Sequence, residues 1–266
     1  MITTLFFFLF GLTLIRHRFY WKAKDTNLFN KNKIIYMAHR GDSKFYPENT
    51  KEAYLAAIEG GFEWIELDIM LSLDKEIVCS HNYDLEKETD GEGLISDTDY
   101  FTLDDIKTGK YTHPHNQKKM PLLKNVIIDF PKTAKYNFEI KTKTLFDLDT
   151  SKRLIATLKN VSPGKFMVSS FNPAVILYFK IFHPEVPLGF LIKGWEWFWL
   201  VNWIHPSFIN PRADMITEDF LKFSKKRNLS ILTWTIDNIP ALEWCERQEI
   251  QGIITDLSGD IIYDRD

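Results

Sequence analysis

The chain has 266 residues, of which 45% are hydrophobic and 26% are charged, so it holds enough apolar material for one large core or two small ones. Its formal net charge of −3 gives no overall attraction to a polyanion, which argues against binding along a nucleic acid backbone. The two cysteines, Cys79 and Cys245, lie far apart and outside any zinc-binding spacing. A disulfide framework and a zinc finger are therefore not expected.

Residues 1–32 differ in composition from the rest of the chain. Residues 1–15 are almost wholly apolar, and the basic residues Arg16, Arg18 and Lys22 follow them. A secretory signal carries its positive charges before the apolar run and a small-residue cleavage site after it, and neither is visible. The run is short for a spanning helix, which needs about 20 apolar residues. We expect a membrane anchor that leaves the main domain cytoplasmic; the alternative is an apolar helix packed on that domain.

Across residues 33–266, short β-rich runs alternate with helical patterns, which is typical of βαβ units and a parallel sheet. Helices are expected at 49–59, 173–182 and 217–227, where capping residues or a first-turn proline begin an apolar period. A single (β/α)8 barrel, or TIM barrel, fits this pattern and length. The eight expected strands are 34–38, 64–69, 136–140, 166–170, 188–192, 208–210, 230–235 and 252–255.

Residues 72–135 interrupt the alternation. This interval carries a short strand pattern at 76–80, a Gly-rich loop at 90–93, a short helical pattern at 103–108 and a stretch rich in His, Asn and Lys at 111–119. We expect an insertion above the barrel mouth, where such folds place functional loops.

Residues 195–203 contain four tryptophans in nine positions. Tryptophan favours sites with one apolar and one wet side, such as a membrane interface or a hydrophobic groove. The same pattern also fits a barrel helix whose aromatic face packs on the sheet. The two interpretations are compatible, and both stay open at this stage.

Three carboxylates are expected at the ends of two barrel strands. Alternation places Glu66 and Asp68 on one face of a strand, which in a barrel is the interior, and Glu139 ends the next barrel strand. Converging carboxylates repel each other unless a cation or a base lies between them. Oxygen ligands of this kind suit one hard divalent cation, Mg²⁺ or Ca²⁺.

Basic and imidazole side chains follow the same strand ends. His39 can transfer a proton near neutral pH, and His81 supplies the second group that acid and base catalysis needs. Arg40 can bind a phosphate through two hydrogen bonds, and Lys141 can hold a phosphate oxygen as a point charge. The set predicts cleavage of a phosphodiester.

These motifs resemble, in order and approximate spacing, those of the glycerophosphodiester phosphodiesterase family. The likeness covers residues 34–257 and rests on His-Arg-Gly at 39–41 with Pro-Glu-Asn-Thr at 47–50, Glu66-x-Asp68, His81, Glu139-x-Lys141, Val-Ser-Ser-Phe at 168–171, Leu-Thr-Trp-Thr at 232–235 and Gly-Ile-Ile-Thr-Asp at 252–256.

The resemblance implies a (β/α)8 barrel with a small insertion after the early strands and hydrolysis of a glycerophosphodiester to an alcohol and glycerol phosphate. By correspondence, the metal ligands would be Glu66, Asp68 and Glu139, the general acid and base His39 and His81, and the phosphate contacts Arg40 and Lys141. Trp234 would line the pocket near the glycerol or head group. One departure is visible: the family usually has Asp after the second His, where this chain has Asn82.

Three functions are considered for this set of residues: hydrolysis of a soluble diester, hydrolysis of a lysophospholipid, and binding without catalysis. A soluble glycerophosphodiester would need only a polar pocket, whereas a lysophospholipid, cleaved in the manner of a lysophospholipase D, would need an apolar groove and membrane access. Residues 1–15 and 195–203 favour lipid access, so membrane contact is expected through the first and considered for the second. A catalytically inactive, membrane-tethered binding protein would be expected to lack one or more of the five catalytic and metal-ligating residues, and all are present.

Overall fold

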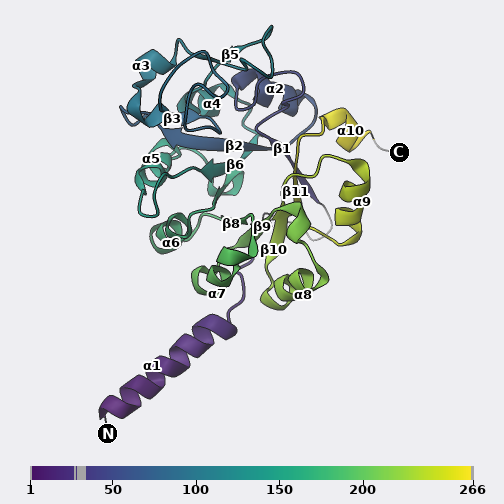
Figure 1. The fold of residues 1–266 in the computed structure, drawn as a ribbon. Coiled ribbons are helices and arrows are strands. Elements are labelled where there is room, and N and C mark those ends of the chain that lie inside the picture. Colours follow the sequence, from purple (N-terminus) through teal and green to yellow (C-terminus); the bar gives the residue numbers. More distant parts are fainter. Residues whose placement is uncertain (1, 27, 29–33, 265–266) are drawn as a thin grey trace.

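Eight parallel strands close into a barrel in the computed structural model, which describes residues 2–26, 28 and 34–264 (Figure 1). Strands pair in the order β1-β11-β10-β9-β8-β7-β6-β2, and pairing of β1 with β2 closes the ring. The (β/α)8 prediction is confirmed. The barrel strands are β1 (Ile35–His39), β2 (Trp64–Leu71), β6 (Lys135–Ile140), β7 (Phe166–Ser170), β8 (Leu188–Ile192), β9 (Phe208–Pro211), β10 (Ser230–Thr233) and β11 (Gly252–Thr255).

Helices surround the strands on the outside of the ring (Figure 1). Polar side chains begin several of them: Thr50 accepts a hydrogen bond from Ala53 N, and Asn172 accepts one from Ala174 N. Such caps satisfy amide groups that the helix leaves without a partner. The outer helices are α2 (Lys51–Glu59), α4 (Leu123–Asp129), α5 (Asp149–Thr157), α6 (Pro173–Phe182), α7 (Val201–Ile204), α8 (Glu218–Arg227), α9 (Ile239–Arg247) and α10 (Gly259–Tyr263).

Strand alternation separates the two faces of the barrel wall. Ile65, Leu67 and Ile69 belong to the large core shared with the helices. Trp64 belongs to a second apolar cluster with residues of other barrel strands, including Met37, Met167, Phe208, Leu232 and Ile254. Glu66 and Asp68 share the face of Trp64 but lie nearer the C-terminal end of β2. Apolar side chains therefore fill the lower barrel, and the carboxylates lie above them toward the mouth.

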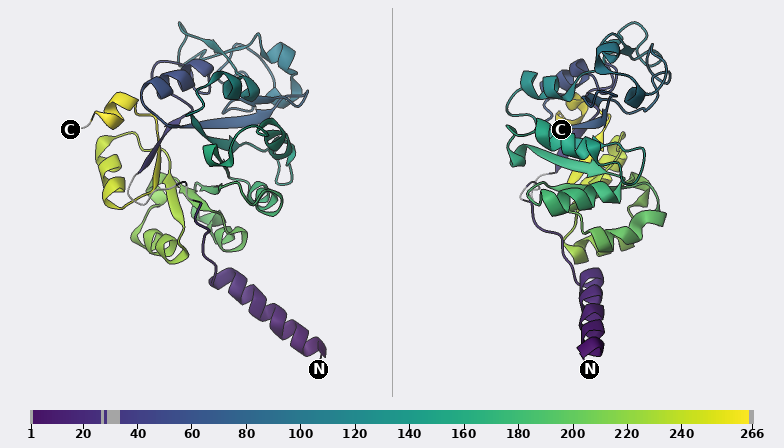
Figure 2. Two further views of the ribbon diagram at one scale, coloured as in Figure 1. Left: turned by 180° about the vertical axis from the view of Figure 1, so that it is seen from behind. Right: turned by 90° about the vertical axis from the view of Figure 1, so that its left-hand side faces the viewer.

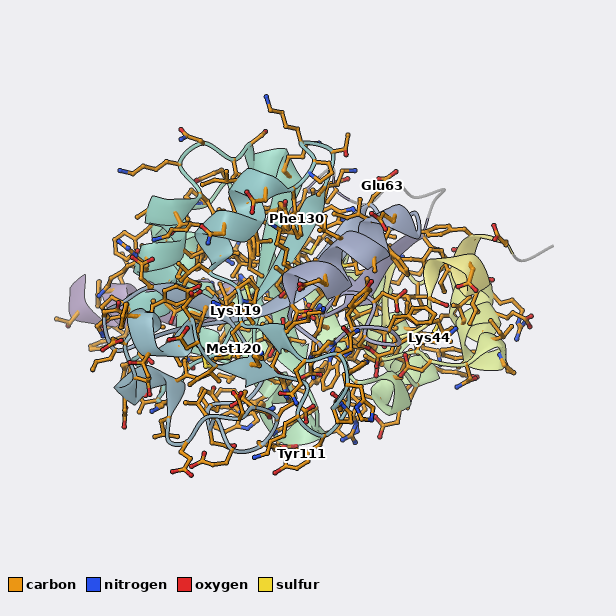
Figure 3. All side chains as sticks on the ribbon, turned by 90° about the horizontal axis from the view of Figure 1, so that it is seen from above. Lys44, Glu63, Tyr111, Lys119, Met120 and Phe130 are labelled. Carbon is orange, nitrogen blue, oxygen red and sulfur yellow. The ribbon has the colours of Figure 1, made fainter. Side chains whose placement is uncertain are left out.

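The predicted insertion has a small core of its own. β3 (Ile77–Cys79) pairs antiparallel with the end of β2, and the segment beyond it packs on Met70, Val78, Leu85, Ile95, Leu103, Met120 and Leu122. Figure 3 looks onto this part of the molecule, where Tyr111 and Lys119 lie at the surface. Its short elements are η1 (Ile95–Asp97), α3 (Tyr100–Leu103), β4 (Lys107–Thr108) and β5 (Lys118–Lys119).

The helix expected at 103–108 is wrong. Asp99 caps a helix that starts at Tyr100 and ends at Leu103, because its side chain accepts a hydrogen bond from Thr102 N. Residues 107–108 then pair with β5 as a two-residue strand. The helix therefore ends before most of the expected range begins, because the cap at Asp99 starts it early and pairing with β5 holds residues 107–108 extended.

At the N-terminus, α1 (Ile2–Phe19) projects away from the barrel beside α7 (Figures 1 and 2). Within the described residues, no helix has the length and apolar character needed to span a bilayer. The predicted boundary between residues 32 and 33 lies outside the described part of the chain, as does Met1. The expected aromatic segment forms η3 (Trp195–Leu200) followed by α7, and the 3₁₀ turns η2 (Pro163–Lys165) and η4 (Ala213–Met215) complete the fold.

Candidate active site

Three predicted carboxylates meet at the mouth of the barrel. β2 carries Glu66 and Asp68, and register pairs Asp68 with Glu139 of β6. One oxygen atom from each of the three carboxylates lies within 4.8 Å of the others. Glu66 is 2% exposed and Asp68 is fully buried. The structure thus brings together the carboxylates that strand alternation placed on one face.

Burial and mutual repulsion change the acidity of this trio. Burial, with the charges of Asp68 and Glu139, raises the pKa of Glu66 well above its usual value. Burial and Asp68 also raise the pKa of Glu139. Burial alone would raise the pKa of Asp68, but Lys141 and Arg40 outweigh it and hold that pKa far below its usual range. Three acids therefore share two cationic partners, which leaves one negative charge in excess when all are ionised.

The donor set fits a hard divalent cation. The Oε1 atom of Glu66 is buried and has no hydrogen-bond partner among the described residues. Lys141 Nζ lies 3.0 Å from Asp68 Oδ1 and 2.7 Å from Glu139 Oε1, so its charge offsets those two carboxylates directly. Buried carboxylate oxygens in excess of their partners suit Mg²⁺ or Ca²⁺.

His39 is held by a carboxylate from the opposite end of the chain. At the end of β1, its Nδ1 atom lies 2.8 Å from Asp256 Oδ1, just beyond β11. Burial alone would raise the pKa of Asp256, but the hydrogen bond and charge of His39 lower it. This contact fixes the imidazole ring through Nδ1 and leaves Nε2 for the cavity.

His81 lies after β3 on the insertion side of the same cavity. Its Nδ1 atom is 4.0 Å from Glu48 Oε1. Burial lowers the pKa of His81 to about 4, so its ring is neutral near pH 7 and can accept a proton. Asn82 also lines the cavity, so the departure from the family pattern lies at the site itself.

Arg40 is positioned by two carboxylates. Its Nη1 atom donates to Glu48 Oε2 at 2.6 Å, and its Nε atom lies 2.9 Å from Asp68 Oδ2. Asn49 Nδ2 donates to the same Asp68 oxygen at 2.9 Å, and Asn49 Oδ1 accepts from Asp68 N. Sequence reasoning included Glu48, Asn49 and Asp256 in motifs but assigned them no role. Only the folded chain shows that they orient the predicted site residues.

A cavity of about 440 Å³ opens at this mouth. Trp234 lines it beside Phe171, with ring centroids 5.6 Å apart in an edge-to-face arrangement, and its Nε1 atom donates to Asn210 O. The lining comprises His39, Arg40, Glu66, His81, Asn82, Tyr83, Asp84, Lys87, Glu139, Lys141, Phe171, Leu191, Lys193, Trp234 and Ile254. Asp68 lies behind this surface, and the sequence did not point to Phe171, Leu191 or Lys193 as lining residues.

The contact between Asp256 and His39 gives a testable expectation. Asp256→Asn keeps a hydrogen-bond acceptor but loses the negative charge and one of the two oxygens of the carboxylate that holds the His39 ring. We expect kcat to fall about 10²-fold with KM little changed, near the lower end of the loss for a missing acid or base. Steady-state kinetics measure this, with Asp260→Asn on the exposed start of α10 as the control. An unchanged kcat would show that Asp256 is not needed to orient His39.

Comparisons with known proteins agree with the fold and the motifs. A model described as the glycerophosphoryl diester phosphodiesterase family matches residues 39–259. The glycerophosphodiester phosphodiesterase of Caldanaerobacter subterraneus subsp. tengcongensis is 30% identical over 237 residues, which cover 84% of this chain and 94% of that protein. An uncharacterized protein of Bacillus subtilis is 33% identical over 230 residues, covering 83% and 93%.

Solved structures share the fold. A phosphodiesterase of Oleispira antarctica, solved with the product sn-glycerol-3-phosphate, superposes with a TM-score of 0.78 at 24% identity, covering 86% of this chain and 95% of that one. The glycerophosphodiester phosphodiesterase of Thermotoga maritima gives a TM-score of 0.69 at 26% identity, covering 88% and 99%. The family model spans the chain from His39 to beyond Asp256 and so includes every site residue described above. The chain belongs to the glycerophosphoryl diester phosphodiesterase family and is a phosphoric diester hydrolase.

Proposed function

We propose that the protein hydrolyses glycerophosphodiesters with one divalent cation, Mg²⁺ or Ca²⁺, held by Glu66, Asp68 and Glu139. The observation that carries this proposal is the meeting of three carboxylate oxygens within 4.8 Å beside a cavity lined by both predicted histidines. A bound cation there would polarise a non-bridging phosphate oxygen and offset the charge that develops on it.

The side chains of the site have complementary roles. Arg40 and Lys141, which line the cavity, bind and orient the phosphate oxygens. One of His39 and His81 takes the proton of the attacking hydroxyl as its oxygen bonds to phosphorus. The other donates a proton to the leaving alcohol oxygen as its bond to phosphorus breaks. The attacking group is water or a hydroxyl of the substrate's own glycerol. In the second case the alcohol leaves as a cyclic glycerol phosphate forms, and water then opens the ring to give glycerol phosphate. Trp234 packs on the glycerol or head group.

Product analysis tests this reaction. We expect purified protein with Mg²⁺ or Ca²⁺ to release glycerol phosphate from glycerophosphocholine and glycerophosphoglycerol, measured by an enzyme-coupled assay. The variant Glu66→Gln, which keeps the side-chain shape but loses a metal-ligating charge, is the matched negative control. Absence of turnover on every diester with every divalent cation tried would contradict the proposal.

A lysophospholipid is the second candidate substrate, and one observation favours it. Phe171, Leu191, Ile254 and Trp234 give the cavity an apolar side that a small polar diester does not need. An acyl chain could be buried there, at roughly 25 cal/mol per Å² of apolar surface. Comparing kcat/KM for lysophosphatidylcholine and glycerophosphocholine decides between them: a higher value for the lipid makes the protein a lysophospholipase D.

The N-terminal segment bears on the location in the cell. We propose that the protein associates with a membrane through residues 1–15 and that the catalytic barrel lies on the cytoplasmic side, in lipid metabolism. The support is the apolar run followed by Arg16, Arg18 and Lys22. Fractionation of cells that express the full chain checks this: recovery in the supernatant without detergent would contradict membrane association.

A further inference from the structure

The side chains of α1 are exposed on every face of the helix. From Leu5 to Phe10, each large apolar side chain is at least 52% exposed, and Leu12 and Ile15 are 47% and 51% exposed. A groove on a protein would cover one face of such a helix and leave the others in water. Acyl chains of a lipid leaflet would instead surround the helix and cover the apolar side chains on all of its faces, so a leaflet matches this exposure better than a protein groove does.

The end of α1 is attached firmly to the barrel. His17 Nε2 lies 3.0 Å from Trp203 O, and the His17 ring lies 4.1 Å from the His205 ring. The Trp21 ring is buried and stacks on the His205 ring, with the ring centroids 4.4 Å apart. These contacts hold the C-terminal end of α1 against α7.

Arg227 at the end of α8 holds the segment after α1. Its Nη1 atom donates to Phe19 O at 2.6 Å and to Trp21 O at 3.2 Å. Its Nη2 atom donates to Asn202 Oδ1 at 3.1 Å, and Trp21 Nε1 donates to the same oxygen. These bonds join α1, α7 and α8 at one point, so the direction of α1 relative to the barrel is fixed.

The surface around this attachment is aromatic. Trp195, Trp197 and Trp199 of η3 are 51%, 56% and 51% exposed, while Phe198 packs inward on α8. At the end of α6, Ile181 and Phe182 are 66% and 64% exposed. Lys180 Nζ donates to Ile204 O and His205 O, which places the end of α6 next to the residues that α1 contacts. These three tryptophans are not in the core, so the interpretation in which they pack on the sheet is wrong for them, whereas their contact with a membrane stays a prediction.

Basic side chains complete this surface. Arg16 and Lys22 are exposed just where α1 meets the barrel, and Arg18 lies over the Trp203 ring at 5.4 Å. Lys225 and Lys226 are exposed at the end of α8, next to Arg227. Cationic side chains beside tryptophans, at the end of an apolar helix, match the order of layers at a leaflet: acyl chains, then interface, then anionic phosphates.

We propose that this surface, here called the docking wall (α1, η3, α7 and the C-terminal ends of α6 and α8), binds the barrel to an anionic lipid leaflet in one fixed orientation. The proposal rests on the membrane association proposed above and adds which side of the barrel faces the lipid. Lys193, which lines the catalytic cavity, precedes Trp195 of the wall by two residues. The rim of the cavity therefore reaches the edge of the docking wall. In the ribbon views, α1 and α7 of the wall lie on the opposite side of the barrel from the insertion (Figures 1 and 2).

Vesicle sedimentation with the full chain tests the charge requirement. We expect stronger binding to phosphatidylcholine vesicles containing phosphatidylserine than to phosphatidylcholine alone. Arg16→Glu with Lys22→Glu should weaken binding to the mixed vesicles at least about tenfold, since each basic residue near an anionic surface contributes several-fold. Lys110→Glu with Lys118→Glu makes the same charge change on the insertion and should have little effect. Equal losses in both pairs, or equal binding to both vesicle types, would overturn the charge requirement.

A polarity-sensitive fluorophore tests the orientation. It is attached to Trp197→Cys on the docking wall or to Tyr111→Cys, which replaces an aromatic residue 64% exposed on the insertion. On vesicles, we expect a blue shift and quenching by brominated lipid at position 197 only. A bound protein whose two labels respond alike would overturn the fixed orientation, and a protein that does not sediment would overturn membrane association as well. Glycerophosphodiester turnover is measured separately in detergent, so a failure of the proposed reaction can be told apart from a failure of membrane binding or of the fixed orientation.

Discussion

Removing divalent cations is expected to stop the reaction, with EDTA lowering turnover at least about 10²-fold and Mg²⁺ or Ca²⁺ restoring it. The reason is the buried trio of Glu66, Asp68 and Glu139, which shares two cationic partners and includes a Glu66 oxygen with no hydrogen-bond partner in the part of the chain that the structure describes. A bound metal ion contributes several kcal/mol to transition-state stabilisation, and each 1.36 kcal/mol is about tenfold in rate. Steady-state rates before and after dialysis against EDTA measure the effect; full activity in EDTA would contradict the metal site.

Thermal unfolding gives a second readout of the same site. Saturating Mg²⁺ or Ca²⁺ should raise the Tm of the protein, because a ligand at about 100 times its Kd stabilises the fold by about 2.7 kcal/mol. Glu66→Gln should lose most of this increase, whereas Glu59→Gln at the exposed end of α2 should keep it. An equal increase in wild type and Glu66→Gln would remove Glu66 from the ligand set.

The metal-free protein should respond to pH in a direction set by the same carboxylates. The pKa of Glu66 is raised by burial and by its acidic neighbours, so the folded state holds this proton to a higher pH than the unfolded state does. Stability therefore falls as the pH rises from the unfolded value of Glu66 toward the raised folded value. The Glu66→Gln variant should lose the part of this fall that comes from Glu66, keep the part from Glu139, and be more stable than wild type at neutral pH without metal.

Replacing either histidine by alanine is the second large effect, with an expected loss of about 10²- to 10⁴-fold in kcat, which is the usual contribution of a general acid or base. His39 is fixed by Asp256, and His81 lines the same cavity from the insertion side. Because both are partly exposed at the mouth, their loss should leave the Tm nearly unchanged. His115→Ala, on the exposed part of the insertion, is the control. Near-normal kcat in His81→Ala would remove it from the mechanism.

The sequence by itself determined the barrel and the residues that meet in it. Each barrel strand is a short β-rich run between helical patterns, so the positions of the eight strands could be read without the fold. The alternation of side chains along β2 is also local, and it placed Glu66 and Asp68 on one face. Caps such as Thr50 and Asn172 are equally local. Motif order then connected His39 and Glu139 to one site.

Only the tertiary structure decided how those residues are held. The contact between His39 and Asp256 joins residues 217 positions apart, because closure of the barrel places β11 beside β1. The attachment of α1 through Arg227 likewise joins segments 208 positions apart. One expectation was wrong for the same reason: residues 107–108, expected in a helix, pair with β5 as β4. Each outcome depends on segments brought together by packing, and no period or spacing within a single segment records which distant partner it will meet.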